Sequence, residues 1–119
     1  MKILSSKAHG IIDYLLVIFL AASPSLFKMG SPLCSITYAL AGVHFLMTIL
    51  TNFEPGLIKV IPFRVHGFIE LVVAIGLGSL SLWFREQGNS LGFYYFAGLA
   101  AAILIVFNIT DFKSSRTAP

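Results

Sequence analysis

The sequence predicts an all-α, polytopic membrane protein: a bundle of four transmembrane helices made of two parallel two-helix repeats. Of the 119 residues, 57% are hydrophobic and 11% are charged, which is too few charges to cover a soluble domain of this size. The chain divides into four apolar stretches, and a bilayer-spanning helix needs about 20 such residues. A short motif containing histidine and a carboxylate occurs in both the first and the third stretch. These spans account for nearly the whole chain, so we expect one transmembrane domain and no separate soluble domain.

The first two spans are bounded by proline. We expect the first over residues 6–22, ending at Ser23-Pro24 because proline disfavours helical geometry in the residue before it. The second is expected to begin at Ser31-Pro32, with serine as the N-cap and proline as the first helical residue, and to run to about Thr51.

The last two spans follow stronger turn signals. Residues 52–56, Asn-Phe-Glu-Pro-Gly, form the first of these signals. The third span is then expected from about Pro62 to Phe84, and the fourth after the polar turn 85–90 as far as about Ile109.

Basic residues predict the orientation in the membrane. Six lie on the side of the termini and the middle loop, and two lie on the opposite side. The six are Lys2, Lys7, Lys59, Arg64, Lys113 and Arg116, and the two are Lys28 and Arg85. Under the positive-inside rule this places both termini in the cytoplasm, as in a multi-pass protein of the inner membrane. These cations flank apolar spans without interleaved aromatic residues, so we expect no nucleic-acid partner.

The duplicated motif is the most specific feature of the sequence. Residues 7–13, Lys-Ala-His-Gly-Ile-Ile-Asp, match residues 64–70, Arg-Val-His-Gly-Phe-Ile-Glu. Because each repeat contains two spans, both copies have the same orientation, which places the two histidines at one depth and the two acids one turn deeper. The glycine after each histidine, Gly10 or Gly67, is expected to let the first and third spans approach closely.

The rest of the two repeats matches less closely. Repeat one covers about 1–56 and repeat two about 57–112, followed by a polar tail at 113–119. The ends of the repeats match only loosely, as Thr51-Asn52-Phe53 and Thr110-Asp111-Phe112.

A further parallel lies at the end of the first span of each repeat. Ser23-Pro24-Ser25-Leu26-Phe27 corresponds to Ser79-Leu80-Ser81-Leu82-Trp83. This arrangement resembles the small bacterial membrane proteins of the SPW-repeat type, although the first copy lacks the tryptophan and the second lacks the proline. The resemblance implies a four-helix inner-membrane protein and brings no established activity with it.

The motif supplies a candidate metal site. A histidine and a carboxylate four residues apart share one face of a helix, so His9 can meet Asp13 and His66 can meet Glu70. If the two helices touch, all four side chains converge. Two imidazoles and two carboxylates suit Zn or Fe. Haem held axially by the two histidines is the other cofactor considered, but it needs more bundle length and glycine clearance than the sequence demonstrates.

Two other interpretations of these residues stay open. Each histidine and acid can simply satisfy one another and fix the helix packing. Alternatively, His44 in the second span can join Asp13 and Glu70 in a proton relay, or it can bond a neighbouring carbonyl, which we favour for a lone histidine.

Catalytic machinery is not expected. The sequence contains no nucleophile elbow, phosphate loop or zincin motif, although a metal ion with an open coordination position can activate water. The expected partners are the lipid bilayer and either further copies of the chain or a larger membrane complex, as an accessory subunit. A small channel or carrier is the alternative function.

Overall fold

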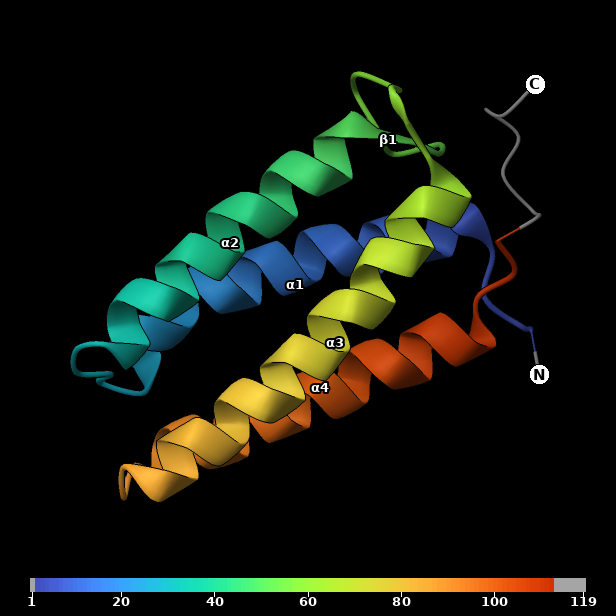
Figure 1. Ribbon diagram of the computed structural model, residues 1–119. Coiled ribbons are helices and arrows are strands. Elements are labelled where there is room, and N and C mark those ends of the chain that lie inside the picture. Colours follow the sequence, from blue (N-terminus) through green and yellow to red (C-terminus); the bar gives the residue numbers. More distant parts are fainter. Residues whose placement is uncertain (1, 113–119) are drawn as a thin grey trace.

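The computed structural model describes residues 2–112 and consists of four helices joined by short connections (Figure 1). The helices are α1 (Ser6–Leu26), α2 (Leu33–Leu50), α3 (Phe63–Glu86) and α4 (Ser90–Ile109), and two short strands, β1 (Thr51–Asn52) and β2 (Ile61–Pro62), lie between α2 and α3. All four helices are long and apolar enough to cross a membrane. At a rise of 1.5 Å per residue they are about 27 to 36 Å long, close to the ~30 Å thickness of a bilayer's hydrocarbon core.

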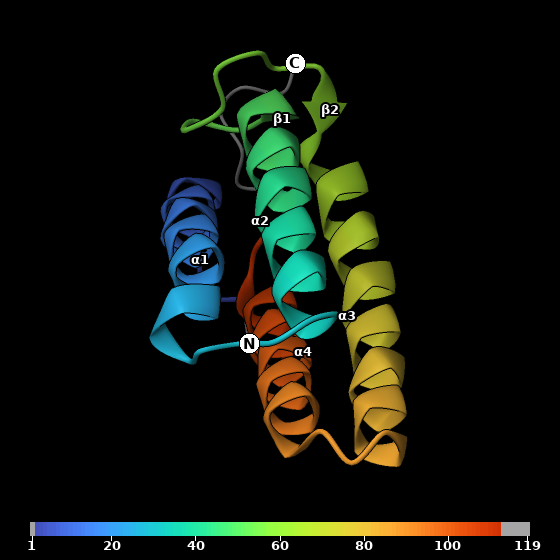
Figure 2. The ribbon, with the colours of Figure 1, turned by 90° about the vertical axis from the view of Figure 1, so that its left-hand side faces the viewer.

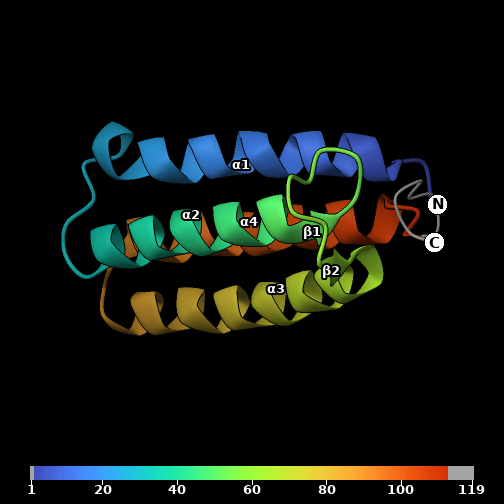
Figure 3. The same ribbon diagram turned by 90° about the horizontal axis from the view of Figure 1, so that it is seen from above.

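The helices pack as two pairs, α1 with α2 and α3 with α4. Each pair corresponds to one predicted repeat, and α1 and α3 run in the same direction. Figures 2 and 3 show α1 and α3 on opposite sides of the bundle, with α2 and α4 between them. The starts of α1 and α3 lie at one end of the bundle together with β1 and β2, which we call the strand end. The α1–α2 and α3–α4 connections lie at the other end, the turn end.

Two of the predicted helix boundaries are wrong. Helix α1 continues through Pro24 to Leu26. Pro24 lies in the last turn, where a missing N–H removes a single backbone hydrogen bond, and its carbonyl still accepts from Met29 N at 2.9 Å. Pro32, rather than Ser31, is the N-cap residue of α2, and no side chain caps this helix.

The turn end of the bundle is filled with apolar side chains. Its fully buried members include Leu20, Leu33, Leu77, Phe84 and Phe96. The rings of Phe84 and Phe96 stack with their centroids 5.7 Å apart. The buried hydroxyls of Ser23, Thr37 and Ser81 in this half each donate to a carbonyl of their own helix. Apart from the Tyr95 hydroxyl, which is buried without a hydrogen-bond partner among the described residues, this half packs as a hydrocarbon core.

At the strand end, the end of each repeat lies beside the start of the other. Strand β1 pairs in parallel with β2, with Thr51 opposite Ile61. An isolated parallel bridge joins Leu4, just before α1, to Thr110, just after α4. These two pairings carry Thr51 toward α3 and Thr110 toward α1, which positions both threonines for the site described next.

Candidate metal centre

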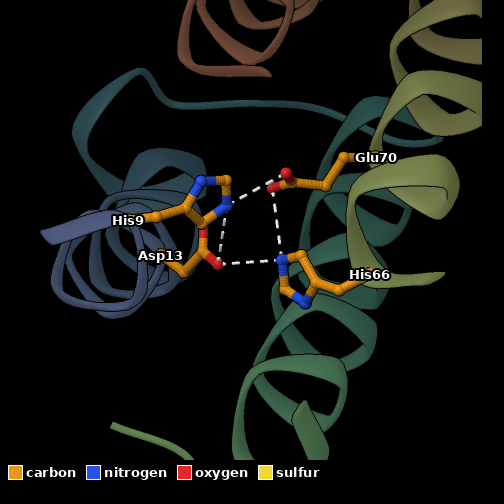
Figure 4. Close-up of side chains that lie close together, drawn as sticks. All are labelled: His9, Asp13, His66 and Glu70. Atoms are coloured by element: carbon orange, nitrogen blue, oxygen red, sulfur yellow. Dashed lines mark ion pairs between the residues drawn. The ribbon is translucent and has the colours of Figure 1, made fainter. Parts of the chain in front are cut away.

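Four ionisable side chains meet inside the bundle at the strand end. His9 and Asp13 come from α1, and His66 and Glu70 come from α3 (Figure 4). Both histidines are fully buried, and the two carboxylates are 2% and 4% exposed. One potential ligand atom from each residue lies within 4.8 Å of all the others. The structure thus brings together the four residues that the sequence selected, and we call them the four-residue cluster.

The shortest contacts in the cluster cross from one repeat to the other. His9 Nε2 lies 3.0 Å from Glu70 Oε1, and His66 Nε2 lies 3.0 Å from Asp13 Oδ2. The contacts within one helix are longer, at 3.3 Å for His9 with Asp13 and 3.5 Å for His66 with Glu70. The dashed lines in Figure 4 join each histidine to both carboxylates, and Glu70 contacts His9 through one oxygen and His66 through the other. The cluster is therefore shared by the two repeats and is not two separate pairs.

None of these close contacts is a well-formed hydrogen bond. Nε2 of His9, Nε2 of His66, Asp13 Oδ2 and Glu70 Oε1 are buried without a hydrogen-bond partner in the described part of the chain. Hydrogen bonds between an imidazolium and a carboxylate are usually about 2.7–2.9 Å long and linear. The four atoms approach one another closely without pointing their N–H groups and lone pairs at each other, which is the arrangement of ligands around a common centre.

Two threonines determine which nitrogen of each histidine carries hydrogen. The Thr51 hydroxyl donates to Met47 O at 2.6 Å, and the Thr110 hydroxyl donates to Val106 O at 2.5 Å. A hydroxyl has a single hydrogen, so each threonine oxygen can only accept from the histidine Nδ1 beside it. These Nδ1–H···O bonds are 2.7 Å for His66 with Thr51 and 2.8 Å for His9 with Thr110. In the neutral imidazoles, the Nε2 lone pair then faces the centre of the cluster.

Three phenylalanines close the strand end over the cluster, and we call Phe53, Phe63 and Phe112 the aromatic lid. Phe63 meets the His9 ring edge to face at 5.2 Å, and Phe53 lies 5.4 Å from the His66 ring. Phe112 contacts both His9, at 5.8 Å, and Phe63, at 4.8 Å. Because Phe53 is fully buried and Phe63 is 3% exposed, the lid separates the cluster from water at this end.

The glycines of the motif make room for Phe112 of the lid and for Pro55 rather than for a helix. A Cβ atom on Gly67 would lie 2.5 Å from Phe112 Cε1, and one on Gly10 would lie 2.5 Å from Pro55 Cγ. The prediction that these glycines bring α1 and α3 into close contact is therefore wrong. The two helices lie diagonally across the bundle, and their side chains bridge the space between them.

His44 reaches the cluster from α2. Its Nε2 lies 3.6 Å from Asp13 Oδ1, the side chain is 11% exposed, and Nε2 has no hydrogen-bond partner among the described residues. We predicted that the His44 side chain bonds a neighbouring carbonyl. Its Nε2 atom makes no such bond and faces Asp13 instead. The backbone carbonyl of His44 accepts the hydroxyl of Thr48 at 2.7 Å.

The sequence analysis missed the residues that support the cluster. Thr110 occupies the C-cap position of α4 and was assigned no part in the site, but its oxygen accepts from His9. Thr51 and the lid residues Phe53 and Phe112 were assigned no part in the site. The loose match of Thr51-Asn52-Phe53 with Thr110-Asp111-Phe112 was the available signal, because it places one threonine and one phenylalanine per repeat at equivalent positions.

Comparison with protein-family models, curated proteins and solved structures gives no match for this chain. The resemblance to SPW-repeat proteins stays a prediction, and the function has to be argued from the site itself.

Proposed function

We propose that this chain is an integral membrane protein that binds one divalent transition-metal ion, Zn²⁺ or Fe²⁺, between its two repeats. The ligands are Nε2 of His9, Nε2 of His66 and one carboxylate oxygen each from Asp13 and Glu70. One observation carries the proposal: four buried ligand atoms converge from two helices and have no hydrogen-bond partners in the described residues.

The spacing of the ligand atoms suits such an ion. Zinc lies about 2.0–2.2 Å from nitrogen and oxygen ligands, so tetrahedral ligands stand about 3.3–3.5 Å apart. The four nitrogen–oxygen contacts of the cluster measure 3.0, 3.0, 3.3 and 3.5 Å. The 3.5 Å contact uses the second oxygen of Glu70, and the four ligand atoms lie within 4.8 Å of one another, so side-chain movements would bring them to the spacing that the ion requires.

Charge balance favours a divalent cation. Two carboxylates carry two negative charges into a site that is at most 4% exposed, and an uncompensated charge in such a place is costly. A divalent ion with two neutral imidazoles makes the total zero. Two imidazolium ions would also cancel the charge, but they would be expected to form short, linear hydrogen bonds to the carboxylates, and the cluster has none.

The surroundings of the histidines are those of metal ligands. A ligating histidine nearly always donates its second N–H to an oxygen, which fixes the ring and its tautomer. Thr51 and Thr110 accept these hydrogens, and the aromatic lid excludes water. The same arrangement occurs once in each repeat, so both histidines are prepared in the same way.

Metal analysis of the purified protein tests the proposal. We expect about one equivalent of bound metal per chain in the wild type and less than about a tenth of an equivalent in the His9→Ala, His66→Ala double variant, which lacks both nitrogen ligands. Thr37→Val is the control, because Thr37 is buried in α2 and its hydroxyl donates to Leu33 O of the same helix, away from the cluster. Equal metal content in the wild type and the double variant would remove the proposed ligands.

The outer surface supports insertion into a bilayer. Large apolar side chains point outward on every helix, including Ile18, Val43, Phe68 and Ile105, which are 61–65% exposed. Only 22–33% of each span is buried inside the bundle. A continuous apolar surface of this kind is unfavourable in water and suits lipid.

The charges at the two ends support the orientation predicted from the sequence. Lys2, Lys7, Lys59 and Arg64 belong to the strand end, and Lys28 and Arg85 belong to the turn end. Lys113 and Arg116 lie outside the described residues. The strand end is accordingly cytoplasmic in our proposal, as in a multi-pass inner-membrane protein.

Cysteine labelling tests this orientation. In a Cys34→Ala background, we expect Gly30→Cys at the turn end to react with a membrane-impermeant maleimide in intact cells. Ile58→Cys at the strand end should react only after permeabilisation, because it faces the cytoplasm. Both positions are exposed. The reverse pattern would contradict the orientation, and labelling of both positions in intact cells would contradict a sealed membrane.

A proton path through His44, Asp13 and Glu70 is the second candidate, favoured by the approach of His44 to Asp13. It lacks a continuation, because the turn end of the described bundle is packed with apolar side chains such as Leu77 and Phe84. We therefore place a metal site ahead of transport. Assembly with further copies or with a larger membrane complex stays a prediction.

A further inference from the structure

Two small cavities adjoin the cluster, and Glu70 belongs to the lining of both. One, of about 60 Å³, lies between the helix pairs, and its lining includes His44 of α2 and Glu70 and Val73 of α3. The other, of about 70 Å³, has Asp13 of α1 and Val106 of α4 in its lining. A buried water needs about 10–15 Å³ of such volume, so each cavity can take a molecule of a few heavy atoms.

The first cavity, which we call the α2–α3 cavity, is apolar except at one end. Apart from His44 and Glu70, all of its lining side chains are aliphatic or methionine. Cavities of this composition tend to stay free of water and to bind apolar molecules. Val43 belongs to the lining and is also 65% exposed on the outer surface, so the cavity reaches toward the side of the bundle that we assign to lipid.

The two ends of the bundle are closed in the described structure, which leaves the two cavities as the approaches to the cluster. The aromatic lid covers it at the strand end, where Phe53 is fully buried. The core around Phe84 and Phe96 fills the turn end, and both rings are at most 1% exposed. An ion or a strongly polar molecule would have to lose its hydration to pass between the helix pairs, whereas a small apolar molecule already dissolved in the bilayer would not.

The polar end of the α2–α3 cavity has a side chain ready to meet a ligand. His44 Nε2 has no hydrogen-bond partner among the described residues and lies 3.6 Å from Asp13 Oδ1. His44 approaches Oδ1 of Asp13, whereas His9 and His66 approach Oδ2, so it lies beside the four converging ligands, where it can meet a molecule bound to the ion. Repeat two offers no histidine at the corresponding place in α4, so this side of the site differs from the other.

We propose that the α2–α3 cavity admits a small, uncharged diatomic molecule of the size of dioxygen from the bilayer to the metal ion, and that His44 donates a hydrogen bond to it once it is bound. This inference rests on the proposed metal site. The binding is reversible coordination, with no bond broken in the ligand. Four protein ligands leave positions open on an ion that accepts more than four, as Fe²⁺ does.

Nitric oxide binding to the iron-loaded protein tests the route. The wild type, loaded with Fe²⁺ without oxygen, is expected to give the electron paramagnetic resonance signal of a ferrous nitrosyl. Val73→Phe should slow nitric oxide association by about tenfold or more, because the added ring occupies the cavity. Val72→Phe is the matched control: the same change, one residue earlier on α3, at a side chain that is 52% exposed and outside the lining. This control should bind nitric oxide at the wild-type rate.

The outcomes separate this inference from the metal proposal. Iron and zinc binding are measured before nitric oxide is added: a wild type that binds neither metal overturns the metal site and the route together, and one that binds zinc but not iron overturns the route alone. Equal association rates in iron-loaded Val73→Phe and Val72→Phe overturn the route alone. If Val73→Phe does not fold, Val73→Leu replaces it and should slow association by a smaller factor. Xenon binding to the metal-free wild type, lost in Val73→Phe or weakened in Val73→Leu, is expected independently of iron, and its absence would contradict the cavity.

Discussion

Removing the metal ion with a chelator is expected to destabilise the wild-type protein by about 4 kcal/mol, if the free metal concentration beforehand is about a thousand times the dissociation constant. The ion neutralises two buried carboxylates and joins α1 to α3, which do not pack as a helix pair. Without the ion, the two buried negative charges are balanced only if Asp13 and Glu70 take up protons or if His9 and His66 are both protonated. Unfolding in detergent, followed with and without the chelator, measures the difference.

The His9→Ala, His66→Ala variant is the control for this experiment. Because it lacks both nitrogen ligands, its stability should not respond to the chelator. A wild type that is equally stable with and without chelator would favour the other interpretation, in which histidine and acid only fix the packing. A similar response in both proteins would show that the chelator acts elsewhere.

Replacing Thr51 or Thr110 by valine is expected to weaken metal binding by about 10–100-fold for each substitution, as is typical when the partner of a ligating histidine is removed. Valine has nearly the shape of threonine but cannot accept the Nδ1 hydrogen of His66 or His9. The buried N–H is then left unsatisfied, and the ring can turn or change tautomer. Competition with a metal-binding dye measures the affinity.

Serine at the same two positions should restore most of the affinity, because it retains the hydroxyl oxygen. Thr37→Val, the same change at a buried threonine near the start of α2, should leave the affinity unaltered. If Thr51→Val and Thr110→Val bind metal as tightly as the wild type, the threonines do not orient the ligands, and their hydrogen bonds serve helix ends only.

Local patterns in the sequence were sufficient to predict the four helices and the convergence of the four side chains in the cluster. The apolar stretches and turn residues predicted all four helices, and α4 ends at Ile109 as expected. The spacing of His9 from Asp13 and of His66 from Glu70 placed each pair on one helix face. The duplication then predicted that the two faces have the same depth, which is why the convergence of the four side chains could be expected without a structure.

The support of the cluster could not be predicted, because it depends on contacts between the repeats. Thr110 meets His9 and Thr51 meets His66, each pair joining the end of one repeat to the start of the other. The parallel pairings of Leu4 with Thr110 and of Ile61 with Thr51 produce this arrangement. These pairings consist of backbone hydrogen bonds, which depend little on side-chain identity and so cannot be predicted from the sequence pattern.

Proline was the least reliable of the local signals. Ser23-Pro24 predicts the end of a helix on steric grounds, but Pro24 lies in the final turn of α1, where the cost is one hydrogen bond. Gly10 and Gly67 were expected to let α1 and α3 approach closely, and this prediction is wrong because other segments lie against both glycines. The space is taken by Pro55 and Phe112, from segments that the sequence shows only as loops.

X-ray absorption at the edge of the bound metal, recorded on the wild-type protein, tests the central claim most directly. The predicted spectrum shows only nitrogen and oxygen neighbours at about 2.0–2.2 Å, with the outer scattering of two imidazole rings that disappears in His9→Ala, His66→Ala. Sulfur in the first shell would place the ion at Cys34 or at a methionine, and a shell without imidazole would place it away from the two histidines. Either spectrum would contradict a metal ion held between the repeats.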